Sequence, residues 1–336
     1  MKTKTPLVIR SPQDAIAAVP YLLGFHPTDS LVVIAYDGPH NTCAMRLDLP
    51  QPDAKAAAER IAALLTQNAF RQALLLGYGS VDDVAPVVTA AWEVLTAHKL
   101  QITEALRITP DRWWSLTCVD GDCCPPEGHP YDISTTVVAA QATLSGHVAL
   151  ENRADLARTL APLEGEPRKA MREATDRAEE RFLSWTREAL TPAEIQSRLV
   201  ASGLTALSTL TPDLTDDEVA WLGVALTSMR VRDEAWIRVN ADDPQRDIDF
   251  WRAILRRVEE PYAAAPACLL AIAAYAAGDG GLANLALDRA QDADPTYSLA
   301  HLLRAVVEAG IPPSQMRLTM SPEALATAYE DKGRPQ

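Results

Sequence analysis

The residues best suited to chemistry lie in one short segment that holds three cysteines and a histidine. Cys118, Cys123, Cys124 and His129 follow the spacing C-x4-C-C-x4-H, and two prolines and a glycine stand before the histidine. Thiolates and imidazoles are the ligands that zinc prefers, and four of them complete a tetrahedron. The segment therefore predicts a zinc site formed by these four side chains.

Two other interpretations of the cysteine segment stay open. Its spacing differs from paired C-x2-C motifs, and successive side chains usually diverge, which argues against two adjacent ligands on one ion. A thiol with a depressed pKa would instead serve redox or modification chemistry. The third interpretation is structural, with a proline-stiffened loop whose buried cysteines act as small apolar side chains.

A second polar group surrounds the start of the first predicted strand. His26, Asp29 and Ser30 lead into a buried apolar run, and Arg46 and Asp48 belong to the next predicted strand. Binding crevices of α/β sheets lie at strand ends, so these side chains predict a ligand site. A catalytic triad is disfavoured, because its members usually come from separate segments. The alternative is local, with Asp29 capping a turn and His26 hydrogen-bonded nearby.

Two adjacent tryptophans, Trp113 and Trp114, precede the cysteine segment. They cannot both point inward from a strand, because successive side chains alternate between its faces. We expect one of them to line a ligand pocket or an interface. The alternative is that one lies in the core and the other packs against the helical half.

The first half of the chain carries the segments that must position these residues. We expect strands over 31–36, 43–49, 73–76 and 100–108, and helices over 15–23, 54–66 and 84–98. After an initial hairpin, strand and helix alternate, which is typical of a sheet with helical crossovers. Residues 1–162 therefore predict an α/β domain, a mixed sheet with flanking helices.

The second half has only helical periodicity. Residues 163–190 predict a long connecting helix, because apolar residues recur every three or four positions between charges. Residues 191–336 predict an all-helical domain with capping boxes at Thr191 and Thr215. Between Pro266 and Gly310, small residues and helix-ending glycines indicate a tetratricopeptide-like helical hairpin, whose repeat is about 34 residues.

Composition narrows the function classes. The 336 residues are 48% hydrophobic and carry a net charge of −14, which disfavours binding to nucleic acids and anionic lipids. No stretch approaches the roughly 20 apolar residues of a membrane span. The five cysteines and the absence of a signal-peptide core favour a cytoplasmic protein with reduced thiols.

Three segments resemble an actinobacterial family of domains of unknown function. They are PYLLGFHPTDSLVV (Pro20 to Val33), RWWSLTCVDGDCCPPEGHP (Arg112 to Pro130) and GDGGLANLALDRAQDADPTYSLAHLL (Gly278 to Leu303). The resemblance reaches both ends of the chain and implies homology over nearly all of it, in a bacterial cytoplasmic setting. It brings no activity, cofactor or catalytic residue.

These observations favour a non-catalytic binding or scaffold protein that acts through protein–protein or small-ligand contacts. The helical half would contact a protein partner, as stacked helical hairpins do. The alternative is an enzyme, a hydrolase or transferase, with a polar site at His26, Asp29, Ser30 and Arg46. Convergence of these four side chains in one cleft is the observation that would favour the enzyme.

Overall fold

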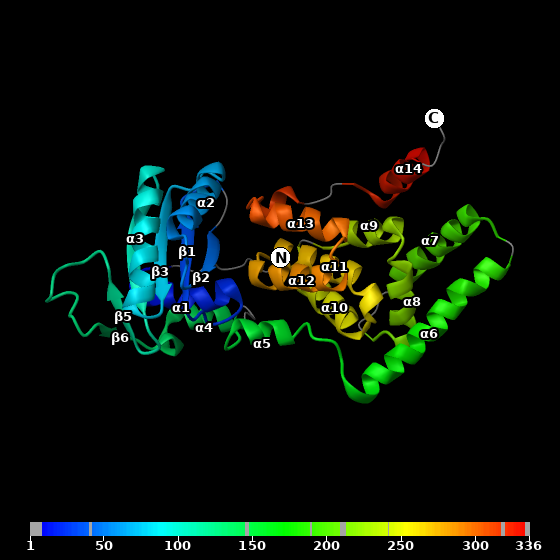
Figure 1. Ribbon diagram of the computed structural model, residues 1–336, viewed down its shortest axis with the longest axis horizontal. Helices are drawn as coiled ribbons and strands as arrows, with labels where there is room; N and C mark the ends of the chain where they lie inside the picture. Colours follow the sequence, from blue (N-terminus) through cyan, green and yellow to red (C-terminus); the bar gives the residue numbers. More distant parts are fainter. Residues whose placement is uncertain are drawn as a thin grey trace. The chain divides into compact units, whose positions relative to one another are not determined.

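The computed structural model describes residues 9–39, 42–144, 148–188, 190–208, 213–240, 242–316 and 320–332. Its contacts divide the chain into two compact units, Met1–Leu156 and Ala157–Gln336. In the described residues the first unit combines a sheet with helices and the second is helical throughout (Figure 1). The predicted fold class, an α/β domain followed by an all-helical half, is confirmed.

A six-stranded mixed sheet forms the centre of the α/β unit, in the order β2-β1-β3-β4-β5-β6. Its strands are β1 Ser30–Tyr36, β2 Cys43–Asp48, β3 Gln72–Tyr78, β4 Gln101–Ile108, β5 Arg112–Ser115 and β6 His129–Pro130. β1 pairs antiparallel with both β2 and β3, whereas β3 and β4 run parallel. β5 and β6 continue the sheet with antiparallel pairing. The predicted initial hairpin is therefore present as β1 and β2.

One helical crossover joins the two parallel strands, because α3 (Val81–Ala97) connects β3 to β4. The helix begins after Ser80, whose hydroxyl accepts a hydrogen bond from the Asp83 N–H at 3.2 Å. Gly77 lets the helix lie close to β3, since a Cβ there would come within 2.3 Å of a Val84 methyl carbon. Gly77, near the end of β3, thus serves the packing of α3 on the sheet.

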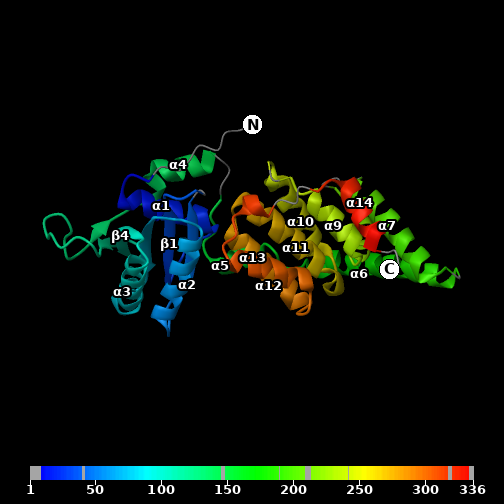
Figure 2. The same ribbon diagram turned by 90° about the horizontal axis from the view of Figure 1, so that it is seen from above.

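Helices cover both faces of the sheet. Figure 2 shows α2 (Ala54–Gln67) and α3 on one side and α1 (Pro12–Leu23) and α4 (Val137–Leu144) on the other. Leu31 and Val33 of β1 are buried with α2 and α3 in the larger core. Since strand side chains alternate between faces, the even-numbered residues of β1 point toward the α1 side. A short helix, α5 (Arg153–Arg158), follows α4.

Nine α-helices are described in the second unit. They are α6 Gly165–Arg187, α7 Pro192–Ser208, α8 Asp216–Ala225, α9 Met229–Ile237, α10 Pro244–Arg257, α11 Ala264–Ala277, α12 Gly280–Ala293, α13 Ser298–Glu308 and α14 Pro322–Lys332. The predicted capping box at Thr215 is present, with Glu218 as its other member. Thr191 and Glu194 make the same reciprocal hydrogen bonds before α7. The described residues of this unit contain no strand.

The tetratricopeptide-like hairpin is formed by α11 and α12, and α13 packs against both (Figure 1). α11 is buried from Ala264 to Ala274 and so forms the core of this unit. Gly278 ends α11 in the left-handed conformation, with φ of 83°. The connector predicted at 163–190 corresponds to α6, which packs against α8. The predicted boundaries at residues 162 and 190 stay predictions.

The residues that the structure describes contain no helix that could span a membrane. None of these helices combines the length and the apolar character that a membrane crossing requires.

Candidate functional site

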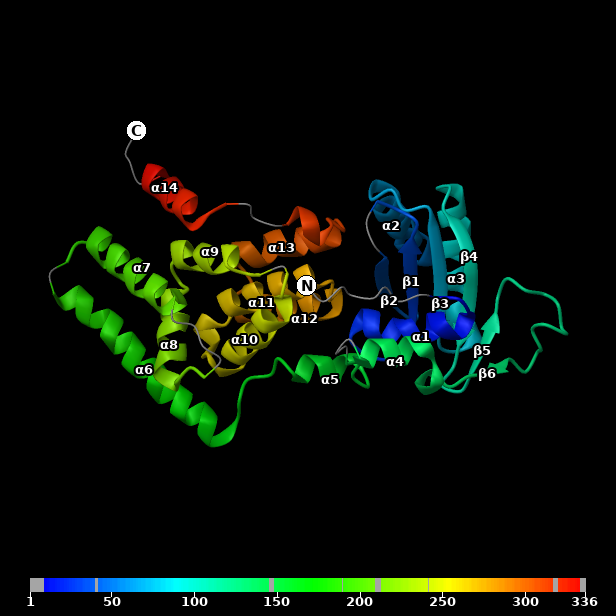
Figure 3. The ribbon, with the colours of Figure 1, turned by 180° about the vertical axis from the view of Figure 1, so that it is seen from behind.

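The three cysteines of the predicted metal site lie together in the loop between β5 and β6. The Sγ atoms of Cys118, Cys123 and Cys124 all lie within 4.8 Å of one another. Figure 3 shows this loop extending beyond the two short strands that carry it. Cys123 is exposed and the other two thiols are half-buried, so the cluster is open to solvent. The sequence-predicted loop thus gathers three potential ligands.

Both adjacent cysteines point into the cluster, contrary to the expectation that their side chains diverge. That expectation holds for extended chains, where successive residues alternate. Here the backbone makes a single helical turn, closed by a 2.7 Å hydrogen bond from the Cys124 N–H to the Asp120 carbonyl. In a turn, neighbouring side chains fan out over less than half a circle, which lets Cys123 and Cys124 converge with Cys118.

His129, the predicted fourth ligand, does not join the thiols. It is paired in β6 opposite Trp113, and its ring stacks on that indole with centroids 4.4 Å apart. Its Nε2 atom is buried and has no hydrogen-bond partner among the described residues. The structure therefore gathers three of the four predicted ligands, because strand pairing holds the imidazole of His129 on the sheet.

The thiols of the cluster influence one another's protonation. Hydrogen bonds from the Asp120 backbone N–H and from the thiols of Cys124 and Cys123 lower the pKa of Cys118. The hydrogen bond with Cys118, followed by desolvation, raises the pKa of Cys124 to about 12. The Cys118 sulfur therefore carries negative charge most readily, while the thiols of Cys123 and Cys124 donate hydrogen bonds to it. A metal ion can take the place of such protons when thiols act as its ligands.

Trp114 anchors the base of the cysteine loop. Its indole N–H donates to the Pro126 carbonyl at 2.9 Å, and the Arg107 guanidinium lies 3.6 Å above its ring. Arg112 donates to the Gly128 carbonyl at 2.8 Å. Gly128 has a φ of +76°, and a Cβ there would lie 2.4 Å from the Trp114 ring. These contacts close the loop at the end that follows the cysteines.

The two tryptophans serve different parts of the structure. Trp113 is in register with Ile108 and stacks on His129, whereas Trp114 is in register with Arg107. The alternation of side chains therefore separates them onto opposite faces of β5. Both are half-buried, and the described contacts of Trp114 hold the loop. Their predicted role in ligand binding stays a prediction.

The donor set of the loop fits a thiophilic metal ion. Zinc–sulfur bonds of about 2.3 Å place the sulfurs of a tetrahedral centre about 3.8 Å apart. Three Sγ atoms within 4.8 Å need only a small contraction to reach that spacing. A tetrahedral ion held by three protein ligands keeps its fourth position for water or another exchangeable ligand. The loop can therefore hold one metal ion through three thiolates.

The second predicted site lies at the end of the sheet where β1 begins. Arg46 pairs with Asp48 at 2.6 Å, and its guanidinium also lies 5.6 Å from the centre of the Phe25 ring. Asp29 is held through its backbone, since its carbonyl accepts from the Leu49 N–H. The His26 N–H donates to the Leu150 carbonyl. The structure thus brings these residues to one region through local contacts.

Ser30 lacks the surroundings of an activated nucleophile. Its side chain is 0% exposed, and its hydroxyl has no hydrogen-bond partner among the described residues. A nucleophilic serine needs a base within hydrogen-bond reach and access to substrate. Burial lowers the pKa of His26, although Glu151 opposes this effect. The described contacts therefore leave the predicted enzyme site without a nucleophile–base pair.

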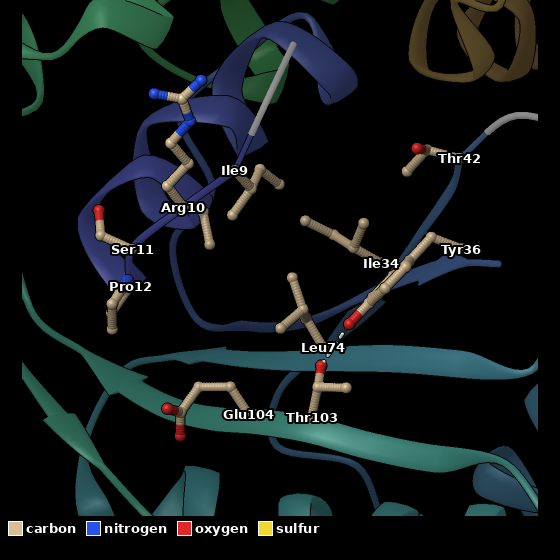
Figure 4. A pocket seen from close by; sticks show the side chains of 11 residues that line it. Ile9, Arg10, Ser11, Pro12, Ile34, Tyr36, Thr42, Leu74, Thr103 and Glu104 are labelled. Carbon is tan, nitrogen blue, oxygen red and sulfur yellow. Dashed lines mark hydrogen bonds between the residues drawn. The ribbon is translucent and has the colours of Figure 1, made fainter. Parts of the chain in front are cut away.

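A cavity of about 460 Å³ lies at the opposite end of β1, between the sheet and the start of α1 (Figure 4). Ile34 and Leu74 form its floor, and Tyr36, Thr103 and Glu104 border it from the sheet. The sequence does not reveal this site, because its residues come from β1, β3, β4, α1 and the segments before α1 and β2, and they form no motif. The site depends on the pairing of β1 with β3, which places Ile34 beside Leu74 and cannot be read from the sequence.

Comparison with known protein families gives a match over most of the chain. The family described as Domain of unknown function (DUF4192) matches residues 12–314, which includes the whole sheet and helices α1 to α13. No curated protein and no solved structure matches the chain. The matched span confirms the resemblance to an uncharacterised family that the three sequence segments indicated. The chain belongs to the DUF4192 family of domains of unknown function.

Proposed function

We propose that this protein is a non-catalytic binding protein of the cytoplasm. It holds one zinc ion in its three-cysteine loop and contacts a protein partner through its helical unit. The convergence of the Sγ atoms of Cys118, Cys123 and Cys124 within 4.8 Å carries the proposal. All five cysteines are free thiols, which agrees with a reducing compartment.

The surroundings of the thiols favour a metal over a disulfide. Three sulfurs lie within 4.8 Å of one another, whereas a disulfide would need only two of them. The Cys118 N–H is held by the Ser115 hydroxyl at 3.1 Å, which fixes the first ligand at the end of β5. The loop is then closed by Trp114 and Arg112, so its shape is set before an ion binds. Preorganisation of this kind strengthens metal binding.

Metal analysis of the full chain tests the zinc proposal. Protein purified without a metal-affinity tag or chelator should contain about one zinc per chain. Metal-free protein titrated with Co²⁺ should develop a thiolate-to-metal charge-transfer band that saturates at about one equivalent. Cys118→Ser and Cys124→Ser should each abolish that band at equimolar Co²⁺.

Cys43→Ser provides the matched control, because Cys43 lies on β2 and outside the loop. This variant should retain full Co²⁺ binding. Equal bands in the Cys43 and Cys118 variants would contradict the proposal. A non-reducing mass of the wild-type chain that is two hydrogens lighter, with no metal bound, would establish a disulfide in place of the metal site.

The stacked helices of the second unit support the protein-binding part of the proposal. α11, α12 and α13 pack against one another in sequence order, as the stacked helices of repeat proteins that bind other proteins do. Leu302 of α13 is 54% exposed, an apolar side chain on the outer surface of this stack. Single exposed apolar side chains are normal on protein surfaces, so Leu302 serves here as the position at which the exposed face of α13 is tested.

A pair of surface variants tests partner binding. Leu302→Glu adds a charge to α13, whereas Val81→Glu adds the same charge to an equally exposed position on α3 of the other unit. A protein captured by the wild-type chain and by the Val81 variant, but lost by the Leu302 variant, supports the proposal. Equal recovery by all three chains contradicts it.

A further inference from the structure

We propose that the cavity between α1 and the sheet binds a small organic amine, a molecule with an apolar body and a protonated amino group. The site lies in the α/β unit, and the residues that line it lie outside the three-cysteine cluster. Its volume of about 460 Å³ is within the range of about 300–1,000 Å³ that small-molecule sites occupy. The ligand class follows from the arrangement of apolar and polar atoms around this volume.

The apolar part of the site is its floor. Ile34 of β1 and Leu74 of β3 are direct cross-strand partners, so their side chains lie next to each other on the α1 face. Ile9, which precedes α1, and Pro12, which begins it, add apolar surface (Figure 4), and Ala15 of α1 also lines the cavity. This lining can receive an aliphatic or aromatic body, whose removal from water contributes to binding.

An irregularity in β4 supplies the polar border. The register between β3 and β4 shifts after Ala73, so that Leu74 pairs with Glu104 and Thr103 is the extra residue. A bulge of this kind redirects side chains at the edge of a site. It brings both Thr103 and Glu104 to the cavity, although neighbouring residues of a regular strand would face opposite sides.

The hydroxyl groups of Tyr36 and Thr103 at this border provide a hydrogen-bond acceptor for a ligand. Thr103 donates its single hydroxyl proton to the Ala73 carbonyl at 3.3 Å. When Thr103 donates to Ala73, the Tyr36 hydroxyl is the donor in its 2.6 Å contact with the Thr103 oxygen. The Tyr36 oxygen can then only accept a hydrogen bond from a ligand.

Glu104 supplies a second acceptor, which is charged. Its Oε1 atom accepts from the Ser115 hydroxyl at 3.0 Å, the Thr117 hydroxyl at 2.6 Å and the Ala105 N–H at 3.1 Å. These bonds fix the carboxylate group on the sheet side of the cavity, across from Ser11 and Pro12 (Figure 4). The hydrogen bonds described for this carboxylate all go to Oε1, so Oε2 is the atom offered to a ligand.

The positive groups near the cavity do not outweigh this carboxylate. The Arg10 side chain is exposed, and Figure 4 shows its guanidinium directed away from Glu104 and Leu74. The N-terminal end of α1 is already occupied, since Ser11 accepts from the Asp14 N–H and Asp14 accepts from the Arg10 N–H. Two acceptors beside an apolar floor therefore select a ligand that donates hydrogen bonds and carries positive charge.

Three probes of equal length test the proposal. The metal-loaded full chain is titrated calorimetrically with n-hexylamine, n-hexanol and hexanoate at neutral pH. Hexylamine should bind about tenfold more tightly than hexanol, because a charge-assisted hydrogen bond replaces a neutral one. Hexanoate should bind more weakly than either. Tighter binding of hexanoate, or equal binding of all three probes, would overturn the proposal.

Two substitutions assign the binding to this cavity. Glu104→Gln keeps a carbonyl oxygen for Ser115 and Thr117 but removes the charge, and should weaken hexylamine binding about tenfold. Glu93→Gln removes the same charge from an exposed position of α3, which covers the other face of the sheet, and should leave affinity unchanged. Unchanged binding in the Glu104 variant, or no binding by the wild-type chain at millimolar hexylamine, would refute the assignment.

Discussion

The glycine at the end of the cysteine loop gives the sharpest stability prediction. Substitution of Gly128 by alanine places a methyl group where the structure has room for none. The added Cβ would lie 2.4 Å from Cε2 of Trp114 and 2.7 Å from its Nε1, the atom that donates to Pro126. The indole must move, and the contact that closes the loop is lost with it.

Two contributions set the size of the effect. The backbone at Gly128 has a φ of +76°, a left-handed conformation that costs a residue with a side chain about 1–2 kcal/mol. Displacement of packed side chains by an extra methyl group costs about 1–3 kcal/mol. Because Trp114 is only half-buried and can partly rearrange, we expect Gly128→Ala to lower the free energy of unfolding of the α/β unit by about 2–4 kcal/mol.

Urea unfolding with pulsed hydrogen exchange measures this unit separately, through peptides from β4 and β5. Gly121→Ala is the matched control in the same loop, since a Cβ there meets nothing within 4 Å and its φ is not in the left-handed range. The control should change stability by less than about 0.5 kcal/mol. Similar small changes in both variants would refute the argument that Trp114 packs on Gly128.

Three further predictions concern other parts of the chain. The side chain of Glu234 in α9 is 2% exposed and pairs with Arg230 and Arg238. Glu234→Gln should therefore lower the free energy of unfolding by about 3–5 kcal/mol in denaturant unfolding. Glu180→Gln, which removes an exposed ion pair, should lower it by less than about 1 kcal/mol, and equal losses in the two variants would contradict the burial argument. Burial lowers the pKa of His26 below its ordinary value of about 6.5, so the unfolded chain binds this proton more readily and stability falls as pH drops through that value. His26→Gln should therefore lose less thermal stability between pH 7.5 and pH 5 than the wild type, and parallel losses would contradict this assignment. Removal of the metal with a chelator should speed amide exchange in residues 116–128 while β1 and β3 keep their protection, and unchanged exchange in the loop would contradict metal binding there.

Much of the fold was predictable because its signals are local. The buried run of β1, the alternation of β2 and the turn between them define a hairpin without further information. Capping residues such as Thr215 mark helix starts through hydrogen bonds to residues three positions away. The glycine that ends α11 is equally local, because it only needs to adopt a left-handed conformation.

The candidate sites were less predictable because they depend on contacts between distant segments. The cysteine motif identified the loop. His129 lies apart from the thiols because it pairs with Trp113 across β5 and β6, and the motif does not show this pairing. The convergence of Cys123 and Cys124 depends on a turn whose closing bond the motif does not reveal. The amine cavity needs the antiparallel pairing of β1 with β3 and the register shift in β4, neither of which leaves a pattern in the sequence.

X-ray absorption at the zinc edge tests the central claim most directly, because it counts the ligands of a bound ion. For the full-length chain purified with its metal, we predict three sulfur neighbours at about 2.3 Å and one lighter oxygen or nitrogen neighbour. A zinc environment made mainly of oxygen and nitrogen would contradict a three-thiolate centre at Cys118, Cys123 and Cys124.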